Sequence, residues 1–315
     1  MNIWLNFLID SLAFGATFMY GSTGEILTEK AGHLNLGIPG IMCMGGAGGC
    51  LVLNMIGKSG LPPFLIVILG ILGSLLLSMF CGLIYSFLTV SLRANQNVTG
   101  LALTTFGVGL MKVIMSKLDA TVYLIGPKAM YRWPFAGRQD SLQSLGILFF
   151  LAIIIALLSS WVLFRTRVGL QLRAVGENPA TADAVGINVT RYKYAATCIG
   201  SMIAGLGGLY YVMDYASGVW SNDAFGDRGW LAIALVIFTI WRPDTGVLAS
   251  ILYGGLYILS INNILPTGGA GVVKELYKML PYVMTIIVLV LTSVRNKKEN
   301  QPPAALGLSY FRGER

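Results

Sequence analysis

Residue types that perform covalent or metal chemistry are few and scattered in this sequence of 315 residues. It has a single histidine, His33, so a haem held by two histidines is excluded. It also lacks a Gly-x-x-x-x-Gly-Lys-Ser/Thr loop, so no nucleotide-phosphate site of that kind is predicted. The cysteines lie in apolar stretches without metal-ligand spacing, and we expect small buried side chains rather than disulfides. They are Cys43, Cys50, Cys81 and Cys198. We therefore predict neither a catalytic nor a metal site.

Uncharged side chains that form hydrogen bonds also occur within the apolar stretches, and such side chains can bind a neutral polar solute. We predict that Asn35, Asn97 and Thr105 line a solute pathway, with plain helix packing as the alternative for each. Ionisable residues are scarce in these stretches, and Asp10 and Lys112 are the clearest examples. This scarcity disfavours a proton-coupled carrier, because such a carrier needs titratable groups along its path.

Gly37 and Gly40 begin a glycine-rich stretch that continues to Gly49. Glycines let helices approach closely, and packing is one interpretation of this stretch. The other is that residues 35–40 form an irregular turn that lines the pathway, because broken membrane helices are tolerated where they face a cavity. Residues 229–241, an uncharged run of 13 residues, are the predicted counterpart, since interrupted segments in two halves often mark transporter binding sites.

Long apolar segments must position these residues. Hydrophobic residues make up 55% of the chain and charged residues 11%, against roughly 25% in soluble domains. That composition excludes an ordinary cytosolic enzyme, a disordered chain and a nucleic-acid-binding domain. A spanning helix needs ~20 mostly apolar residues. We therefore predict an all-α bundle of eight or nine transmembrane helices, which forms a single membrane domain over residues 1–295. The predicted spans are 2–23, 31–57, 59–92, 94–111, 141–164, 194–213, 245–273 and 279–294, with 229–241 as the short ninth.

Lysines and arginines in the connections predict the orientation, because cytoplasmic loops carry an excess of these residues. Placing the C-terminus in the cytoplasm puts 13 of them inside and 8 outside. With nine spans, the N-terminus is then external. Residues 165–193 and the polar tail 296–315 fall on the cytoplasmic side, and we expect the tail to be frayed.

The cytoplasmic segment 165–193 carries the clearest local signal. Asn178 is a favourable helix N-cap, Pro179 suits the first helical position, and Gly186 can end a helix in a left-handed conformation. We predict a short helix outside the membrane over residues 179–185. Its small side chains, such as Ala180 and Ala182, would let it sit deep in a groove of a partner. An ordinary loop with a chance cap is the alternative.

The string Gly176-Glu-Asn-Pro-Ala-Thr-Ala-Asp-Ala-Val-Gly186-Ile resembles the Gly-x-Asn-Pro-x-Ala-Ala-x-x-x-Gly-Ile coupling segment of ATP-binding-cassette (ABC) importer permeases. That family handles simple sugars, nucleosides and branched-chain amino acids. Thr181 replaces the first alanine of the pair. Residues 29–40 resemble the family's Glu-Arg-x-Gly-x-x-Asn-x-Gly-x-x-Gly signature, and residues 226–255 resemble its late segment. The resemblance covers residues 24–294, and residues 93–100 favour the nucleoside (guanosine-type) branch.

The resemblance implies the pore subunit of a bacterial ABC importer in the plasma membrane, one that hydrolyses nothing itself. A separate ATPase, which binds ATP and Mg, would dock on the coupling segment. A second permease subunit, similar or identical, and an extracellular solute-binding lipoprotein would complete the transporter, surrounded by membrane lipid and without nucleic acid. The implied ATPase-coupling residues are Gly176, Glu177, Asn178, Pro179, Ala180, Ala182 and Gly186. The alternatives are a carrier or channel that works alone and a structural subunit of a larger membrane complex. Simple sugars remain the second choice of solute.

Overall fold

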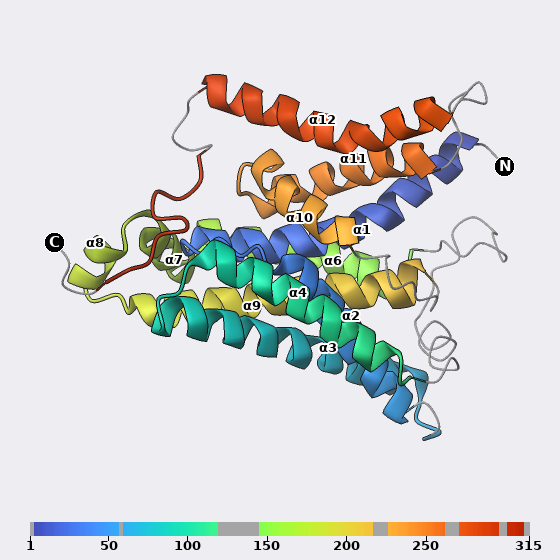
Figure 1. Ribbon diagram of the computed structural model, residues 1–315, viewed down its shortest axis with the longest axis horizontal. Helices are drawn as coiled ribbons and strands as arrows, with labels where there is room; N and C mark the ends of the chain where they lie inside the picture. The colour runs from blue at the N-terminus through green and yellow to red at the C-terminus, as the bar shows by residue number, and fades with distance from the viewer. Residues whose placement is uncertain are drawn as a thin grey trace.

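The computed structural model describes residues 3–56, 59–118, 145–216, 226–261, 271–295 and 301–311. The secondary-structure elements that these residues form are all helices, in agreement with the predicted fold class. Most of them lie along the long axis of the molecule (Figure 1). In chain order they are α1 (Ile3–Lys30), α2 (Ile38–Ile56), α3 (Pro63–Ser86), η1 (Phe87–Ser91), α4 (Gln96–Met115), α6 (Ile147–Arg165), α7 (Arg167–Glu177), α8 (Pro179–Ala184), α9 (Val189–Tyr210), η2 (Tyr211–Tyr215), α10 (Gly226–Phe238), α11 (Pro243–Ile261) and α12 (Gly271–Arg295). The elements η1 and η2 are single π-helical turns that continue α3 and α9.

The helices α2 and α9 form the interior of the bundle. In their apolar windows 78% and 83% of the residues are buried, against 28% in the window of α3 and η1. Glycines permit this close approach. A Cβ atom on Gly45 would lie 2.2 Å from the Gly205 carbonyl oxygen, and one on Gly208 would lie 1.9 Å from the Met42 oxygen. Neither position has room for a side chain, so these glycines pack helices together, as one of the two interpretations predicted.

Five helices in the described part of the chain are long and apolar enough to cross a membrane: α2, α3 with η1, α4, α6, and α9 with η2. The total of eight or nine spans stays a prediction. Several predicted boundaries were wrong. The second span begins at Ile38 rather than residue 31, and the first helix runs on past residue 23 to Lys30. The stretch predicted as one span, 245–273, covers most of α11, which ends at Ile261, and only the first residues of α12, which starts at Gly271.

The described part of the C-terminal tail is packed, which corrects the expectation of a frayed tail. The Ala305 N–H donates to the Gly176 carbonyl oxygen at 3.0 Å, and the Gly307 N–H donates to the Gly32 oxygen at 3.3 Å. The Tyr310 hydroxyl donates to the Asp183 carboxylate at 3.0 Å. The polar composition was misleading because backbone hydrogen bonds, which do not depend on side-chain polarity, hold residues 301–311 in place.

Candidate functional site

Residues that are distant in sequence meet at the end of the molecule that carries α7, α8 and the tail (Figure 1). We call this the basic end. It comprises residues 29–37, residues 89–96, α7, α8, the first turn of α9, the α10–α11 turn and residues 301–311. Lys30, Arg173 and Arg242 line one cavity of about 350 Å³ there. Arg93 stacks on the Phe311 ring, 4.5 Å from its centroid. Most of the described lysines and arginines predicted to be cytoplasmic therefore lie together.

The signature over residues 29–40 forms the turn between α1 and α2. Gly32 has φ +82° and ends α1: its N–H donates to the Glu29 oxygen at 2.8 Å, and the His33 N–H donates to the Thr28 oxygen at 3.3 Å. This is a Schellman cap, in which a left-handed residue closes the helix, and glycine adopts that conformation without strain. The irregular turn predicted over residues 35–40 is thus shorter than expected, because α2 begins at Ile38 and continues unbroken to Ile56.

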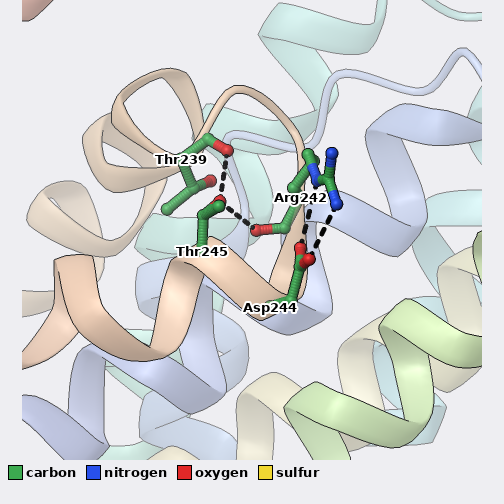
Figure 2. A network of polar contacts seen from close by, with 4 residues as sticks. All are labelled: Thr239, Arg242, Asp244 and Thr245. Atoms are coloured by element: carbon green, nitrogen blue, oxygen red, sulfur yellow. Dashed lines mark hydrogen bonds and ion pairs between the residues drawn. The ribbon is translucent and has the colours of Figure 1, made fainter.

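The Trp241-Arg-Pro-Asp-Thr-Gly246 segment forms the end of the turn between α10 and α11 and the first turn of α11, and Figure 2 shows its polar contacts. Ile240 and Trp241 have φ +56° and +52°, a conformation that L-residues other than glycine rarely adopt. The Thr245 hydroxyl donates to the Thr239 oxygen at 2.7 Å and lies 2.9 Å from the Arg242 oxygen. Arg242 also makes a two-point contact with Asp244, at 3.2 and 2.8 Å. These bonds hold the strained turn in one conformation.

That turn places an indole against a buried acid on α1. The Trp241 Nε1–H donates a hydrogen bond to the Glu29 carboxylate. One helical turn earlier, the Glu25 carboxylate accepts the Asn35 N–H at 2.9 Å. Both glutamates are buried, and their i, i+4 spacing puts them on one face of α1. Two sequence motifs separated by about 200 residues are therefore joined through α1.

Three of the predicted pathway residues are packed inside the bundle. The Asn35 side chain accepts the Gly37 N–H at 2.9 Å, which makes the turn before α2. A Cβ atom on Gly40 would lie 2.6 Å from the Leu103 oxygen, so this glycine seats α2 against α4. Asn35, Gly37 and Gly40 are all buried, and the structure gives each a contact with the backbone or side chain of a neighbour.

The other two predicted pathway residues lie apart from these three. Asn97 and Thr105 are exposed on α4, eight residues apart and hence on the same face of that helix. Leu101 lies between them, also exposed, and its carbonyl oxygen accepts the Thr105 hydroxyl at 3.1 Å. This side of α4 carries two uncharged polar side chains among apolar ones, and the exposed Lys112 lies seven residues after Thr105.

The segment predicted to couple contains the short helix α8, one residue shorter than expected. The Asn178 side chain caps it by accepting the Thr181 N–H at 3.0 Å, and Pro179 occupies the first helical position. Gly186, at φ +87°, closes it with a second Schellman cap, in which the Ile187 N–H donates to the Ala182 oxygen at 3.0 Å. Both ends of α8 are thereby fixed.

The outer and inner faces of α8 differ. Ala180, Ala184 and Gly186 are exposed, and Val185 exposes 71% of its surface. Ala182 points inward instead, where it is 2% exposed in a small apolar cluster with residues 175 and 189. α8 and its C-terminal cap therefore present small side chains outward, the polar Thr181 among them, together with Val185, while the inner face holds α8 on α7 and α9.

Gly176 and Glu177 tie the same segment to α1 and the tail. A Cβ atom on Gly176 would lie 2.2 Å from the Lys30 carbonyl oxygen, so the backbone at Gly176 packs directly against the backbone at the end of α1. The Glu177 carboxylate is exposed and accepts the Ala304 N–H at 3.3 Å. The structure thus brings the two amino-terminal residues of the predicted coupling string into contact with two other parts of the chain.

His33 lies in the connection before α2 and is buried. Its Nδ1 is 3.0 Å from the Thr197 hydroxyl oxygen. Burial, with a smaller contribution from the charge of Lys193, lowers the pKa of His33 well below its usual value, so the imidazole is neutral at physiological pH.

Sequence reasoning missed Glu25, Glu29 and Trp241 as buried polar partners. The first predicted span ends at residue 23, before the two acids, whereas α1 continues to Lys30 and carries both Glu25 and Glu29 into the interior. The spacing of Glu25 and Glu29 by four residues, directly before a glycine-containing signature, is the signal that could have revealed them. Residues 119–144, which include most of the connection between the predicted spans 94–111 and 141–164, lie outside the described residues.

Comparison with known proteins assigns the chain to a transporter family. The family model described as "Branched-chain amino acid transport system / permease component" matches residues 7–289. The nucleoside ABC transporter permease protein NupC of Lactococcus lactis subsp. cremoris is 32% identical over 298 residues, which cover 90% of each chain. The guanosine ABC transporter permease protein NupQ of Bacillus subtilis is 29% identical over 323 residues, which cover 97% of this chain and 96% of NupQ.

Proposed function

The chain belongs to the family of the branched-chain amino acid transport system permease component, and from that premise we propose that it forms the membrane pore of a bacterial ABC importer for nucleosides. It is a non-catalytic permease subunit of an ABC transporter, and ATP hydrolysis belongs to a separate subunit. The observation that carries the proposal is α8, a capped helix with a small-residue outer face at the basic end, within a string that resembles the family's coupling segment.

In this proposal the ATPase docks on α8. The outer face has no long side chain among Ala180, Ala184, Val185 and Gly186, so a partner can approach its backbone closely. The caps at both ends make α8 a rigid helix rather than a flexible loop, because its terminal backbone groups are already hydrogen-bonded. A rigid helix moves as a unit when the ATPase displaces it, so the displacement reaches the residues packed behind it.

The contacts behind α8 give the displacement a route to the bundle. Ala182 packs with Val175 and Val189, which joins α8 to α7 and to the first turn of α9. Gly176 lies against Lys30 at the end of α1. Because α9 is among the most buried helices, a movement of α8 would shift the interior packing between discrete arrangements, as in other rigid-body switches.

The basic end is cytoplasmic in this proposal, and residues 301–311 with it. The excess of lysine and arginine at that end supports the orientation. An extracellular solute-binding lipoprotein would deliver solute at the opposite end. A second permease subunit would face α4, with lipid on the exposed apolar faces of α3 and α6, where Leu76 and Trp161 are examples.

The solute pathway is proposed to follow the exposed face of α4. Asn97 and Thr105 offer uncharged hydrogen-bonding groups on that face, which suit a polar neutral solute such as a nucleoside. Asn35, Gly37 and Gly40 would affect the pathway indirectly, because they set the distance between α2 and α4. The names of the relatives support nucleosides as the solute, and simple sugars are the second choice.

Uptake by the reconstituted transporter tests the proposal. Proteoliposomes that contain this chain, its ATPase and its binding protein should accumulate labelled guanosine only with ATP inside. Unlabelled nucleosides should compete, whereas ribose and leucine should not. Solute entry without the ATPase would contradict the assignment to an ABC importer, and competition by sugars alone would change the solute and leave the rest in place.

Docking on α8 is tested by a substitution on its exposed face. Ala184→Arg should abolish co-purification of the ATPase and ATP-driven uptake, because a long charged side chain prevents close approach. Ser59→Arg, at an exposed position beyond the far end of α2, is the matched control and should behave like the unmodified chain. Ala182 is unsuitable for this test, since a larger side chain at that buried position would unfold α8. Normal uptake by the Ala184→Arg variant would exclude α8 as the docking element.

A further inference from the structure

A cavity of about 490 Å³ lies at the basic end, between the end of η1 and the start of α9. Three basic side chains line it: Arg93, Arg191 and Lys193. It lies apart from the α4 face to which the solute pathway is assigned, and it borders the docking helix α8, since Asp183 and Gly186 also line it. Neither of those functions accounts for its charge.

Lys193 is the unusual member of this set. It is 2% exposed, and no hydrogen bond or ion pair within the described part of the chain involves it. Burying an ammonium group without a partner is costly, and buried charges in proteins are paired as a rule. An amine that lines a cavity and lacks a partner within the described chain points to an anion supplied from outside.

The surroundings of Lys193 favour an anion as well. The cavity is at the N-terminus of α9, where the helix dipole is positive and the first N–H groups have no partner within the helix. Asp183 is the single carboxylate among the described lining residues, and it already accepts the Tyr310 hydroxyl. His33 also lines the cavity, and its neutral imidazole adds no opposing charge.

The position of the cavity indicates where the anion comes from. On α9, Arg191, Ala195 and Ile199 are exposed at intervals of four residues, so one face changes from basic to apolar in two turns. On the neighbouring η1, Phe87 is exposed, and so is Leu92 directly after η1. A basic pocket at the margin of an apolar surface matches the layer in which lipid headgroups lie.

We propose that this cavity binds the phosphate group of an anionic phospholipid, with Lys193 as its ion partner and Arg191 at the entrance. The acyl chains would lie along the exposed apolar face that contains Ile199. Free phosphate has the same oxyanion chemistry, and the experiment separates the two sources. The proposal does not depend on which solute the chain transports.

Native mass spectrometry of the purified full-length chain in detergent tests this site. Phosphatidylglycerol and phosphatidylcholine are added at equal concentrations, and the occupancy of each is compared. The unmodified chain should retain phosphatidylglycerol preferentially. Lys193→Gln and Arg191→Gln should each weaken its apparent affinity about fivefold, the loss expected for one basic contact near a headgroup. Lys117→Gln, an exposed lysine at the far end of α4, is the matched control with the same change of charge.

Inorganic phosphate, added without lipid, forms the second arm of the experiment. If it raises the thermal unfolding temperature of the unmodified chain but not of the Lys193→Gln variant, free phosphate is the source and the anion site stands. The Arg191→Gln variant keeps the test valid should Lys193→Gln fail to fold, because residue 191 is exposed. Equal phosphatidylglycerol affinity in the unmodified chain and both variants, with no effect of phosphate, would overturn the proposal.

Discussion

The indole nitrogen of Trp241 donates a hydrogen bond to the Glu29 carboxylate, although the two residues are 212 positions apart in the sequence. Glu29 belongs to the last turn of α1, and Trp241 belongs to the strained turn between α10 and α11. This contact joins two segments that resemble family motifs and anchors the α10–α11 turn to a helix in the centre of the bundle.

Trp241→Phe should lower the thermal stability of the chain. The substitution keeps the aromatic bulk but removes the N–H, so the buried Glu29 carboxylate loses a donor at a cost of roughly 1–3 kcal/mol. The midpoint of thermal unfolding in detergent measures the effect. Trp4→Phe, at a largely exposed position on α1, is the control and should leave the midpoint unchanged. Equal midpoints for both variants would mean that the Trp241 bond contributes no net stability.

Gly208→Ala should disrupt the packing of α9 on α2. The added Cβ atom would lie 1.9 Å from the Met42 carbonyl oxygen, so the helices must separate. We expect aggregated material or a clearly lower unfolding temperature, as measured by fluorescence-detected size-exclusion chromatography and thermal unfolding.

Gly109→Ala is the control for this substitution. Gly109 is exposed on α4, with no heavy atom within 4 Å of the added Cβ. Alanine is also the better helix former by about 1 kcal/mol, so the stability should be equal or slightly higher. A Gly208→Ala variant as stable as Gly109→Ala would show that the α2–α9 contact can adjust.

His33 should remain neutral in the folded chain at pH 5.5, because burial and the charge of Lys193 lower its pKa well below 6.5. The unfolded chain takes up a proton at this residue below about pH 6.5, whereas the folded chain does not. Folding stability from His33 is therefore complete above that pH and decreases as the pH falls through it. Selective ¹⁵N-histidine labelling reports the state directly, since the chain has one histidine. Titration of the imidazole near pH 6.5 in the folded protein would contradict the prediction.

Removal of residues 301–315 should loosen the segment that contains α7 and α8. The truncation deletes the bonds from Ala305 to Gly176 and from Tyr310 to Asp183. Hydrogen–deuterium exchange in residues 176–187 should therefore accelerate. A chain that ends at Phe311 keeps these contacts and is the matched control. Identical exchange in both truncated chains would mean that the tail does not restrain α8.

The sequence alone determined the fold class and the family. Long apolar runs with few charges require membrane helices, because every backbone group in lipid must be bonded within the segment. The short helix α8 was also predictable, since Asn178, Pro179 and Gly186 act through local caps that involve residues at most five positions apart. Local chemistry of this kind can be read from consecutive residues.

Contacts between distant segments were decided by the tertiary structure. Composition suggested a frayed tail, yet Ala305 and Gly307 bond to backbone groups of α7 and of the α1–α2 turn. The burial of Glu25 and Glu29, their partners Asn35 and Trp241, and the isolation of Lys193 in a cavity likewise depend on which helix ends meet. A single sequence gives the residue types but not the contacts between distant segments. Hydrogen bonds and buried charges depend on distances between parts of the chain, and no local pattern encodes those distances.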